Sequence, residues 1–276
     1  MARQPTFFIP HGGGPCFFMD WNPPDEWDRH RQFLKDLPGT LPERPRALLV
    51  ISGHWKEPAF TMQTNPAPPL LFDYGGFPPH TYELTWPAPG DPALAERVHD
   101  LIRAAGLPAA KDAVRGFDHG VFVPLKVAFP EADIPCVQLS VASDLDPGRH
   151  IALGQALAPL RDEGVLILGS GNTYHNMGVM MRSLRCGPRG DIVGGAFDTW
   201  LTEATTCPDS EDRNRRLTHW SDAPGGRDAH PREEHLIPLH VVAGAAGDDI
   251  TFLALSKAPF ASVEQKLGTG TQSHVN

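Results

Sequence analysis

The segment ALLVISGHW, residues 47–55, sets the fold class of this chain. Its first six residues are all apolar or small and do not alternate with polar residues. A glycine and a histidine follow them. Such a run is typical of a strand that is buried on both faces. The same pattern recurs at residues 7–9 (FFI), 136–141 (CVQLSV), 165–169 (VLILG) and 250–256 (ITFLALS). We therefore expect a central sheet with helices on both sides.

Helical patterns lie between these strands. Two of them open on an Asp-Pro pair, at Asp91 and Asp146, which suits an N-cap followed by a proline in the first turn. A third is expected to start near His230, with two glutamates in its first turn. The predicted helices cover residues 91–106, 119–129, 146–164, 195–204 and 230–247. Alternating strands and helices predict an α/β sandwich, and without repeats or linkers we expect one domain over residues 1–276.

Thirteen histidines occur in the 276 residues, and their placement is informative. His11, His54 and His175 each follow the end of a different predicted strand. In open α/β sheets this edge binds ligands. A capping or core role would explain one such histidine, but not the repeated placement. His119 and His235, near the starts of two predicted helices, are further candidates, and a cluster of imidazoles favours Zn, Fe, Cu or Ni over Mg or Ca.

Several residues near the histidines have simpler interpretations. Glycines 12–14 would let the backbone approach a ligand without side chains filling the cavity. Cys16 is interpreted as a small buried residue rather than a soft metal ligand. Glu233 and Glu234 suit a helix start, although either could reach a metal. The segment GSGN, residues 169–172, lacks the third glycine and the acidic partner of a dinucleotide-binding turn.

The composition argues against several classes of partner. A formal net charge of −9 and a pI near 5.8 disfavour nucleic acids and anionic membranes. No apolar run approaches the ~20 residues that span a bilayer, and we expect no signal peptide. The four cysteines have irregular spacing, which predicts reduced thiols in a cytoplasmic protein; they are Cys16, Cys136, Cys186 and Cys207.

The segment 58–90 is rich in proline and aromatic residues and shows little regular pattern. A loop of this length is uncommon unless it covers a site. We therefore predict that it covers the pocket and influences substrate choice, and the alternative is a rigid surface loop. The candidate walls of the pocket are Tyr74, Phe77, Tyr82 and Trp86.

Seven motifs together carry a family resemblance. In chain order they are HGGGP, SGHW, FDYGGFPPHTYELTWPAPG, RGFDHGVFVPL, DIPCVQLS, GSGNTYHN and AHPREEHLIPL. Their order resembles that of the class III extradiol ring-cleaving dioxygenases, in particular the DOPA 4,5-dioxygenase-like subgroup. The resemblance runs from about Phe7 to Leu255, which is nearly the whole chain.

This resemblance implies a fold and a set of roles. The fold is a three-layer α/β sandwich with a mixed central sheet and a site at the carboxyl ends of the strands. His11, His54 and His235 would be metal ligands, although related ring-cleaving enzymes use two histidines and a carboxylate, so Glu234 is the alternative third ligand. His175 would be the acid–base residue beside the metal. His119 would contact substrate or oxygen.

The expected activity is cleavage of a catecholic ring by O₂, with Fe(II) as the active metal and Zn able to replace it in purified protein. Three protein ligands leave open positions for catechol and O₂, and an imidazole suits the proton transfers. A homo-oligomer is compatible with this expectation. The alternatives are a zinc hydrolase and a non-catalytic relative that binds a ligand. A third is a closed structural zinc site with His175 as its fourth ligand. The presence of both His119 and His175 favours the dioxygenase.

Overall fold

The computed structural model describes residues 2–22, 24–180, 195–249 and 252–253. Within them, one sheet of seven strands has the order β4-β3-β5-β2-β6-β1-β7. The strands are β1 (Thr6–Pro10), β2 (Ala47–Glu57), β3 (Phe60–Gln63), β4 (Ala109–Asp112), β5 (Cys136–Ala142), β6 (Val165–Gly171) and β7 (Phe252–Leu253). Neighbouring strands are parallel except for β3 and β5, which are antiparallel. The predicted mixed sheet is therefore confirmed.

The four predicted strands that the structure fully describes are present at the centre of this sheet. Of the predicted run 250–256, only β7 lies within the described residues. Strands β3 and β4 were not predicted, and β3 begins inside the segment 58–90, which we expected to be irregular. Both strands have only four residues, and AAKD in β4 has almost no apolar pattern.

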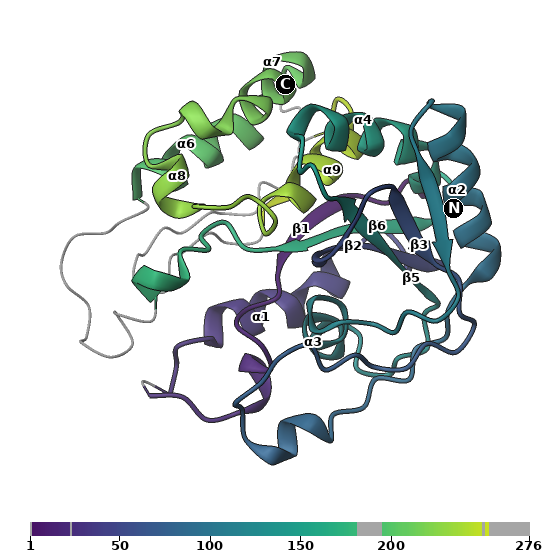
Figure 1. Cartoon of the computed structure of the whole chain (residues 1–276), viewed down its shortest axis with the longest axis vertical. Coiled ribbons are helices and arrows are strands. Elements are labelled where there is room, and N and C mark those ends of the chain that lie inside the picture. The colour runs from purple at the N-terminus through teal and green to yellow at the C-terminus, as the bar shows by residue number, and fades with distance from the viewer. Residues whose placement is uncertain (1, 23, 181–194, 250–251, 254–276) are drawn as a thin grey trace, which may run out of the picture.

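Helices cover both faces of the sheet, as Figure 1 shows. Leu49 and Ile51 of β2 pack in one core with α2 (Pro92–Ala104), α4 (Pro147–Leu157) and α9 (Ile237–Ala246). Leu48 and Val50, on the opposite face, pack in a second core with α1 (Asp28–Asp36) and α3 (His119–Ala128). The alternation along one strand thus fills two cores, which confirms the three-layer α/β sandwich.

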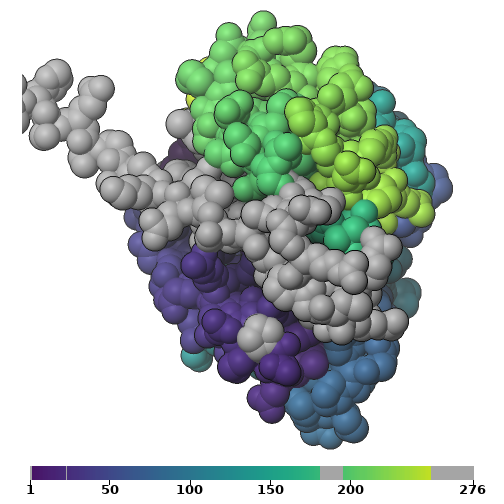
Figure 2. All heavy atoms as spheres, turned by 90° about the vertical axis from the view of Figure 1, so that its left-hand side faces the viewer, coloured from purple at the N-terminus to yellow at the C-terminus, as the bar shows by residue number. Residues whose placement is uncertain are grey.

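Helices α6 (Gly195–Thr205), α7 (Ser210–Thr218) and α8 (Gly226–Ala229) form a group beside α9. Figure 2 shows them at one end of the molecule, with blue residues of the loop between β3 and α2 at the other end. The sequence predicted α6 but neither α7 nor α1. Each of these two helices buries only one apolar side chain, Leu217 in α7 and Leu34 in α1, so the apolar stripe of an amphipathic helix is almost absent.

Two predicted helix starts are confirmed and one is wrong. The side chain of Asp91 accepts a hydrogen bond from Leu94 N, and that of Asp146 accepts one from Arg149 N. The third helix, α9, begins at Ile237 instead of near His230. Residues 231–236 form bends and turns, and Pro238 stands in the first turn of α9. His230 precedes a proline, a position that disfavours helical backbone.

Candidate active site

Five histidines from distant parts of the chain gather at the carboxyl edge of the sheet. His11 directly follows β1, and His175 comes four residues after β6. His119 is the first residue of α3, and His235 lies in the turn before α9 rather than in the first turn of that helix. We expected His11, His54 and His175 each to follow the end of a strand. His11 and His175 do so, whereas His54 does not.

His54 lies inside β2, because this strand continues to Glu57 instead of ending at residue 52. The pairing of β2 with β5 shifts register between Ser52 and Lys56. Such a bulge changes the direction in which a side chain points. The bulge explains how a residue within a strand can join the cluster at the sheet edge.

Three of the histidines form a compact group. The Nε2 atoms of His11 and His54 are 3.2 Å apart, and Nδ1 of His235 is also 3.2 Å from Nε2 of His11. One nitrogen from each ring lies within 4.8 Å of the other two. His11 and His235 are buried, whereas 21% of the His54 side chain is exposed. The structure thus brings together the three residues that the resemblance implies as metal ligands.

The three imidazoles are neutral at physiological pH. Burial, reinforced by the neighbouring imidazoles, holds the pKa of His11 and of His235 well below 6.5. Burial also lowers the pKa of His54 to about 3. Neutral imidazole nitrogens are metal ligands, and an all-nitrogen set suits Zn, Fe, Cu or Ni. The residues present therefore fit the metal ion that the resemblance implies.

Backbone contacts hold the turn that carries His235 against the sheet. The backbone N–H of Asn172, after β6, donates to the carbonyl oxygen of His235 at 3.0 Å. A Cβ atom on Gly171 would lie 2.1 Å from the same oxygen, and one on Gly53 would lie 2.7 Å from the oxygen of Glu234. Glycine is needed at these two positions because the turn approaches both strands closely.

The backbone conformation and the close neighbours of Gly12 and Gly14 explain why glycine stands after His11. Gly12 and Gly14 have φ values of +73° and +58°, which favour glycine. A Cβ on Gly12 would meet Sγ of Cys16 at 2.1 Å, and one on Gly14 would meet the ring of Phe77 at 2.7 Å. Both glycines therefore make room for side chains of the protein itself. Cys16 is buried, as expected, and its burial raises the pKa of its thiol to about 12.

Two further groups that could hold a metal flank the three-histidine group. One contains His175, Glu234 and His235, and the other contains His54, Asp73 and His119. Each shares one histidine with the central group. Glu234 also lies close to a cation, since its Oε2 is 3.2 Å from Nε of Arg232. The alternative third ligand, Glu234, thus belongs to a flanking group and not to the group around His11.

His175 and His119 lie on two sides of the central group. The ring of His175 stacks on that of His235, and burial lowers the pKa of His175 although the charge of Glu234 opposes this shift. The ring centroid of His119 is 3.9 Å from that of His54. Both rings therefore lie beside the proposed ligands.

Sequence reasoning did not identify the polar residues that support these histidines. Ser170 Oγ lies 3.4 Å from Nδ1 of His11 and donates a hydrogen bond to the carbonyl oxygen of Gly120. Ser170 can therefore accept a hydrogen bond from Nδ1–H of His11, which leaves the lone pair on Nε2. Asp118 is fully buried and accepts hydrogen bonds from Ser52 and Arg115. Only the neighbouring motifs SGHW, GFDHG and GSGN pointed to this region.

The loop between β3 and α2 contributes aromatic rings near His119. The ring of Tyr74 is 5.7 Å from that of His119 and also contacts the rings of Phe77 and Tyr82. Trp86 differs from the other candidate walls, because it is only 2% exposed and donates a hydrogen bond to the carbonyl oxygen of Phe129. Trp86 is a core residue, so we drop it as a candidate wall.

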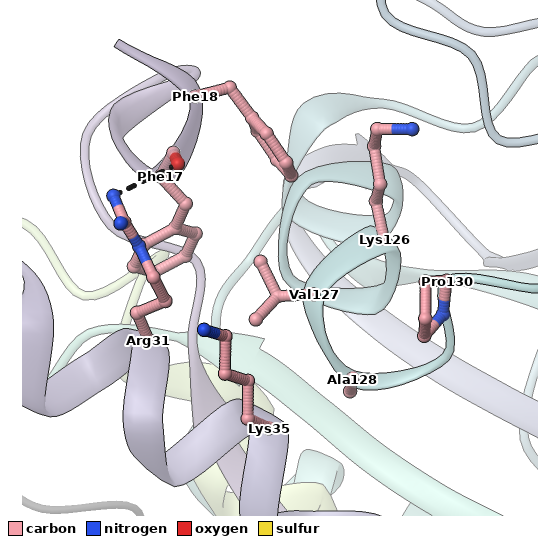
Figure 3. A pocket seen from close by; sticks show the side chains of 8 residues that line it. All are labelled: Phe17, Phe18, Arg31, Lys35, Lys126, Val127, Ala128 and Pro130. Carbon is pink, nitrogen blue, oxygen red and sulfur yellow. Dashed lines mark hydrogen bonds between the residues drawn. The ribbon is translucent and has the colours of Figure 1, made fainter. Parts of the chain in front are cut away.

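A separate groove of about 460 Å³ lies between α1, α3 and the short helix η1 (Cys16–Phe18), as Figure 3 shows. Apolar side chains and three cations line it, and none of the five histidines does. The lining residues are Phe17, Phe18, Arg31, Lys35, Lys126, Val127, Ala128 and Pro130. This groove is distinct from the histidine site.

Residues 5–269 match the family described as the catalytic LigB subunit of aromatic ring-opening dioxygenase. The chain belongs to the LigB family. It is 42% identical over 249 residues to the 4,5-DOPA dioxygenase extradiol of Beta vulgaris. This alignment covers 88% of this chain and 87% of the relative. It is 37% identical to the enzyme of the same name from Portulaca grandiflora, which covers 90% and 88%.

A solved structure shares the fold of this chain. The crystal structure of an uncharacterized Escherichia coli K12 protein has 32% sequence identity and a TM-score of 0.62, and the match covers 78% of this chain and 81% of that one. These relationships confirm an extradiol ring-cleaving dioxygenase, and nothing in them favours the zinc hydrolase or the ligand-binding relative. Among the described residues, no helix is long and apolar enough to cross a membrane.

Proposed function

We propose that this chain cleaves the ring of a catecholic substrate with O₂, using one Fe(II) ion held by His11, His54 and His235. The observation that carries the proposal is the convergence of one nitrogen from each of these rings within 4.8 Å. DOPA is the first substrate to test, because several relatives are named for it. When bound, Fe(II) supplies a common centre at which a singlet catechol and triplet O₂ can react. Zn can occupy the same ligands, since the affinity order for divalent metals favours it over Fe(II).

His175 is proposed as the acid–base residue. Burial lowers its pKa, so its imidazole is neutral near pH 7 and can accept a proton from a catechol hydroxyl group. The same imidazole can return the proton later in the reaction. Its ring stacks on that of His235 and lies outside the group around His11, so it stands beside the proposed metal position, where proton transfer is needed.

His119 is proposed to bind substrate or oxygen through a hydrogen bond. Its ring lies between those of His54 and Tyr74, with centroid distances of 3.9 Å and 5.7 Å. Tyr74 therefore offers an aromatic face close to a hydrogen-bonding group. This combination suits a planar ring that carries hydroxyl groups. The extent of the catalytic unit, residues 1–276, the cytoplasmic location and a homo-oligomeric state remain predictions from the sequence.

Anaerobic reconstitution tests this proposal. Purified protein is stripped of metal, loaded with Fe(II) or with Zn(II), and mixed with DOPA and other catechols in air. We expect the Fe(II) form to consume O₂ and to give a yellow ring-opened product, and the Zn(II) form to do neither. Hydrolysis of esters or amides by the Zn(II) form, without oxygen uptake by the Fe(II) form, would support the zinc hydrolase instead.

A further inference from the structure

The carboxylate of Asp73, in the loop between β3 and α2, lies between two of the site histidines. Its Oδ1 accepts a hydrogen bond from the backbone N–H of His119 at 3.0 Å and lies 2.6 Å from Nδ1 of the same residue. Its Oδ2 lies 3.5 Å from Nδ1 of His54. One carboxylate thus faces the Nδ1 atoms of a proposed ligand and of a proposed substrate-binding residue.

The loop holds this carboxylate in place. Leu71 N donates to the carbonyl oxygen of Phe117 at 2.7 Å, and Asp73 N donates to that of Leu71 at 3.0 Å. The first contact ties the loop to the segment just before His119. Only 21% of the Asp73 side chain is exposed. The carboxylate is therefore held both by hydrogen bonds within its own loop and by the contacts of this loop with the residues at the start of α3.

Each oxygen of the Asp73 carboxylate faces the Nδ1 atom of one imidazole. An ionised carboxylate accepts hydrogen bonds and donates none. The carboxylate therefore favours the tautomer of each facing ring that carries its proton on Nδ1, and this tautomer leaves the lone pair on Nε2.

We propose that Asp73 is a positioning residue that sets the tautomer of both His54 and His119, an inference that rests on the proposed function. For His54, the lone pair then faces Nε2 of His11 at 3.2 Å. Because Nδ1 of His11 faces Ser170, the lone pair of the His11 ring also stands on its Nε2 atom. Two facing lone pairs repel one another, and a metal ion between them removes this repulsion. For His119, an Nε2 lone pair is available to accept a hydrogen bond from a hydroxyl group.

Two variants separate the two halves of this proposal. In Asp73→Asn the amide oxygen can still accept from His119, but the amide N–H groups then face Nδ1 of His54 and favour its wrong tautomer. In Asp73→Ala both acceptors are lost. Asp133→Asn is the matched control, because Asp133 forms an exposed ion pair with Arg44.

The readouts are imidazole tautomers and zinc affinity, and neither depends on turnover. Long-range ¹H–¹⁵N correlation spectra of the Zn(II)-loaded, ¹⁵N-histidine-labelled protein report which ring nitrogen carries the proton. In the wild type and in Asp133→Asn, His119 should carry it on Nδ1. Asp73→Asn should keep this tautomer but weaken Zn(II) binding by about 10- to 100-fold. Asp73→Ala should weaken Zn(II) binding to a similar extent and also lose the Nδ1–H tautomer of His119.

Other outcomes would overturn the proposal. Unchanged tautomers and unchanged zinc affinity in both variants would show that Asp73 positions neither ring. Complete loss of Zn(II) in both variants, as in His11→Ala, would make Asp73 a direct ligand. The side chain of asparagine has nearly the same shape as that of aspartate, so Asp73→Asn should unfold at the same urea concentration as the wild type. An equal urea midpoint shows that weaker Zn(II) binding does not come from a less stable fold. Failure of the wild type to cleave catechols would instead contradict the proposed function and leave these two readouts intact.

Discussion

The imidazole of His175 stacks on that of His235, with ring centroids 3.4 Å apart and an angle of 24° between the planes. His235 belongs to the group of three histidines around His11, whereas His175 belongs to a flanking group with Glu234. The two rings are therefore in contact and have different proposed roles, one in metal binding and one in proton transfer.

The first prediction separates these roles. His175→Gln should retain most of the bound metal and lose about 10²- to 10⁴-fold in rate, as expected for a lost acid–base group. His11→Ala should lose metal and rate together. Metal content by mass spectrometry and the rate of oxygen uptake check both statements. Equal loss of metal in the two variants would instead favour His175 as a fourth ligand of a closed site.

The second prediction concerns the turn that carries His235. Gly171→Ala should push this turn away from β6, because the added Cβ would lie 2.1 Å from the carbonyl oxygen of His235. We expect weaker Zn(II) binding and a loss of about 1–3 kcal/mol in the free energy of unfolding. Gly39→Ala is the control, since a Cβ at Gly39 has no atom within 4 Å. Zinc titration and urea denaturation measure the two effects, and unchanged zinc affinity in Gly171→Ala would argue against a role for this close contact.

The third prediction concerns the aromatic loop. Tyr74→Ala should raise KM for catechols several-fold, because an aromatic contact contributes about 0.5–1.5 kcal/mol. Tyr74→Phe keeps the ring and should change KM little, although it loses the hydrogen bond to the carbonyl oxygen of Thr81. Steady-state oxygen uptake at varied catechol concentration gives these values. If Tyr74→Ala had the wild-type KM, the loop would be a surface feature and not a wall of the pocket.

The fourth prediction concerns His150, which is buried in α4 and is not one of the five site histidines. Burial lowers its pKa from 6.5 to about 4, while Nε2 accepts a hydrogen bond from Ala142 N. The unfolded state therefore binds a proton that the folded state excludes between about pH 6.5 and 4. Stability is full above pH 6.5 and falls as the pH decreases through this window, by about 2 kcal/mol at pH 5 for this group alone.

His150→Gln checks this prediction. The variant should be less stable at pH 7, and its free energy of unfolding should depend less steeply on pH between 7 and 5 than that of the wild type. Urea midpoints at several pH values give both slopes. Equal slopes would mean that His150 does not contribute to the acid sensitivity of the fold.

The central strands could be predicted from the sequence because a strand buried on both faces has a continuous apolar run. Strands β3 and β4 lack this signal, since each is short and β4 contains Lys111 and Asp112. The start of α9 was misplaced because an Asp-Pro or His-Pro pair can open a helix or a turn with the same residues. In this chain Asp91-Pro92 opens a helix, whereas His230-Pro231 opens a turn.

The histidines of the site could be identified from the sequence, but their supporting residues could not. His11 and His175 follow strands, and that repetition is visible in the sequence. Asp73 and His119 are 46 positions apart, and Ser170 and His11 are 159 positions apart. No local pattern distinguishes such an aspartate or serine from the others, because the contact exists only after the sheet has brought the segments together.

The position of the bound metal distinguishes the group around His11 from the two flanking groups. A crystal structure of the Fe(II)-loaded protein, with an anomalous map at the iron edge, locates the ion without reference to activity. We expect one peak about 2.1 Å from a nitrogen of each of His11, His54 and His235, with His175 outside the ligand set. A peak in the group of His54, Asp73 and His119, or in that of His175, Glu234 and His235, would contradict this expectation.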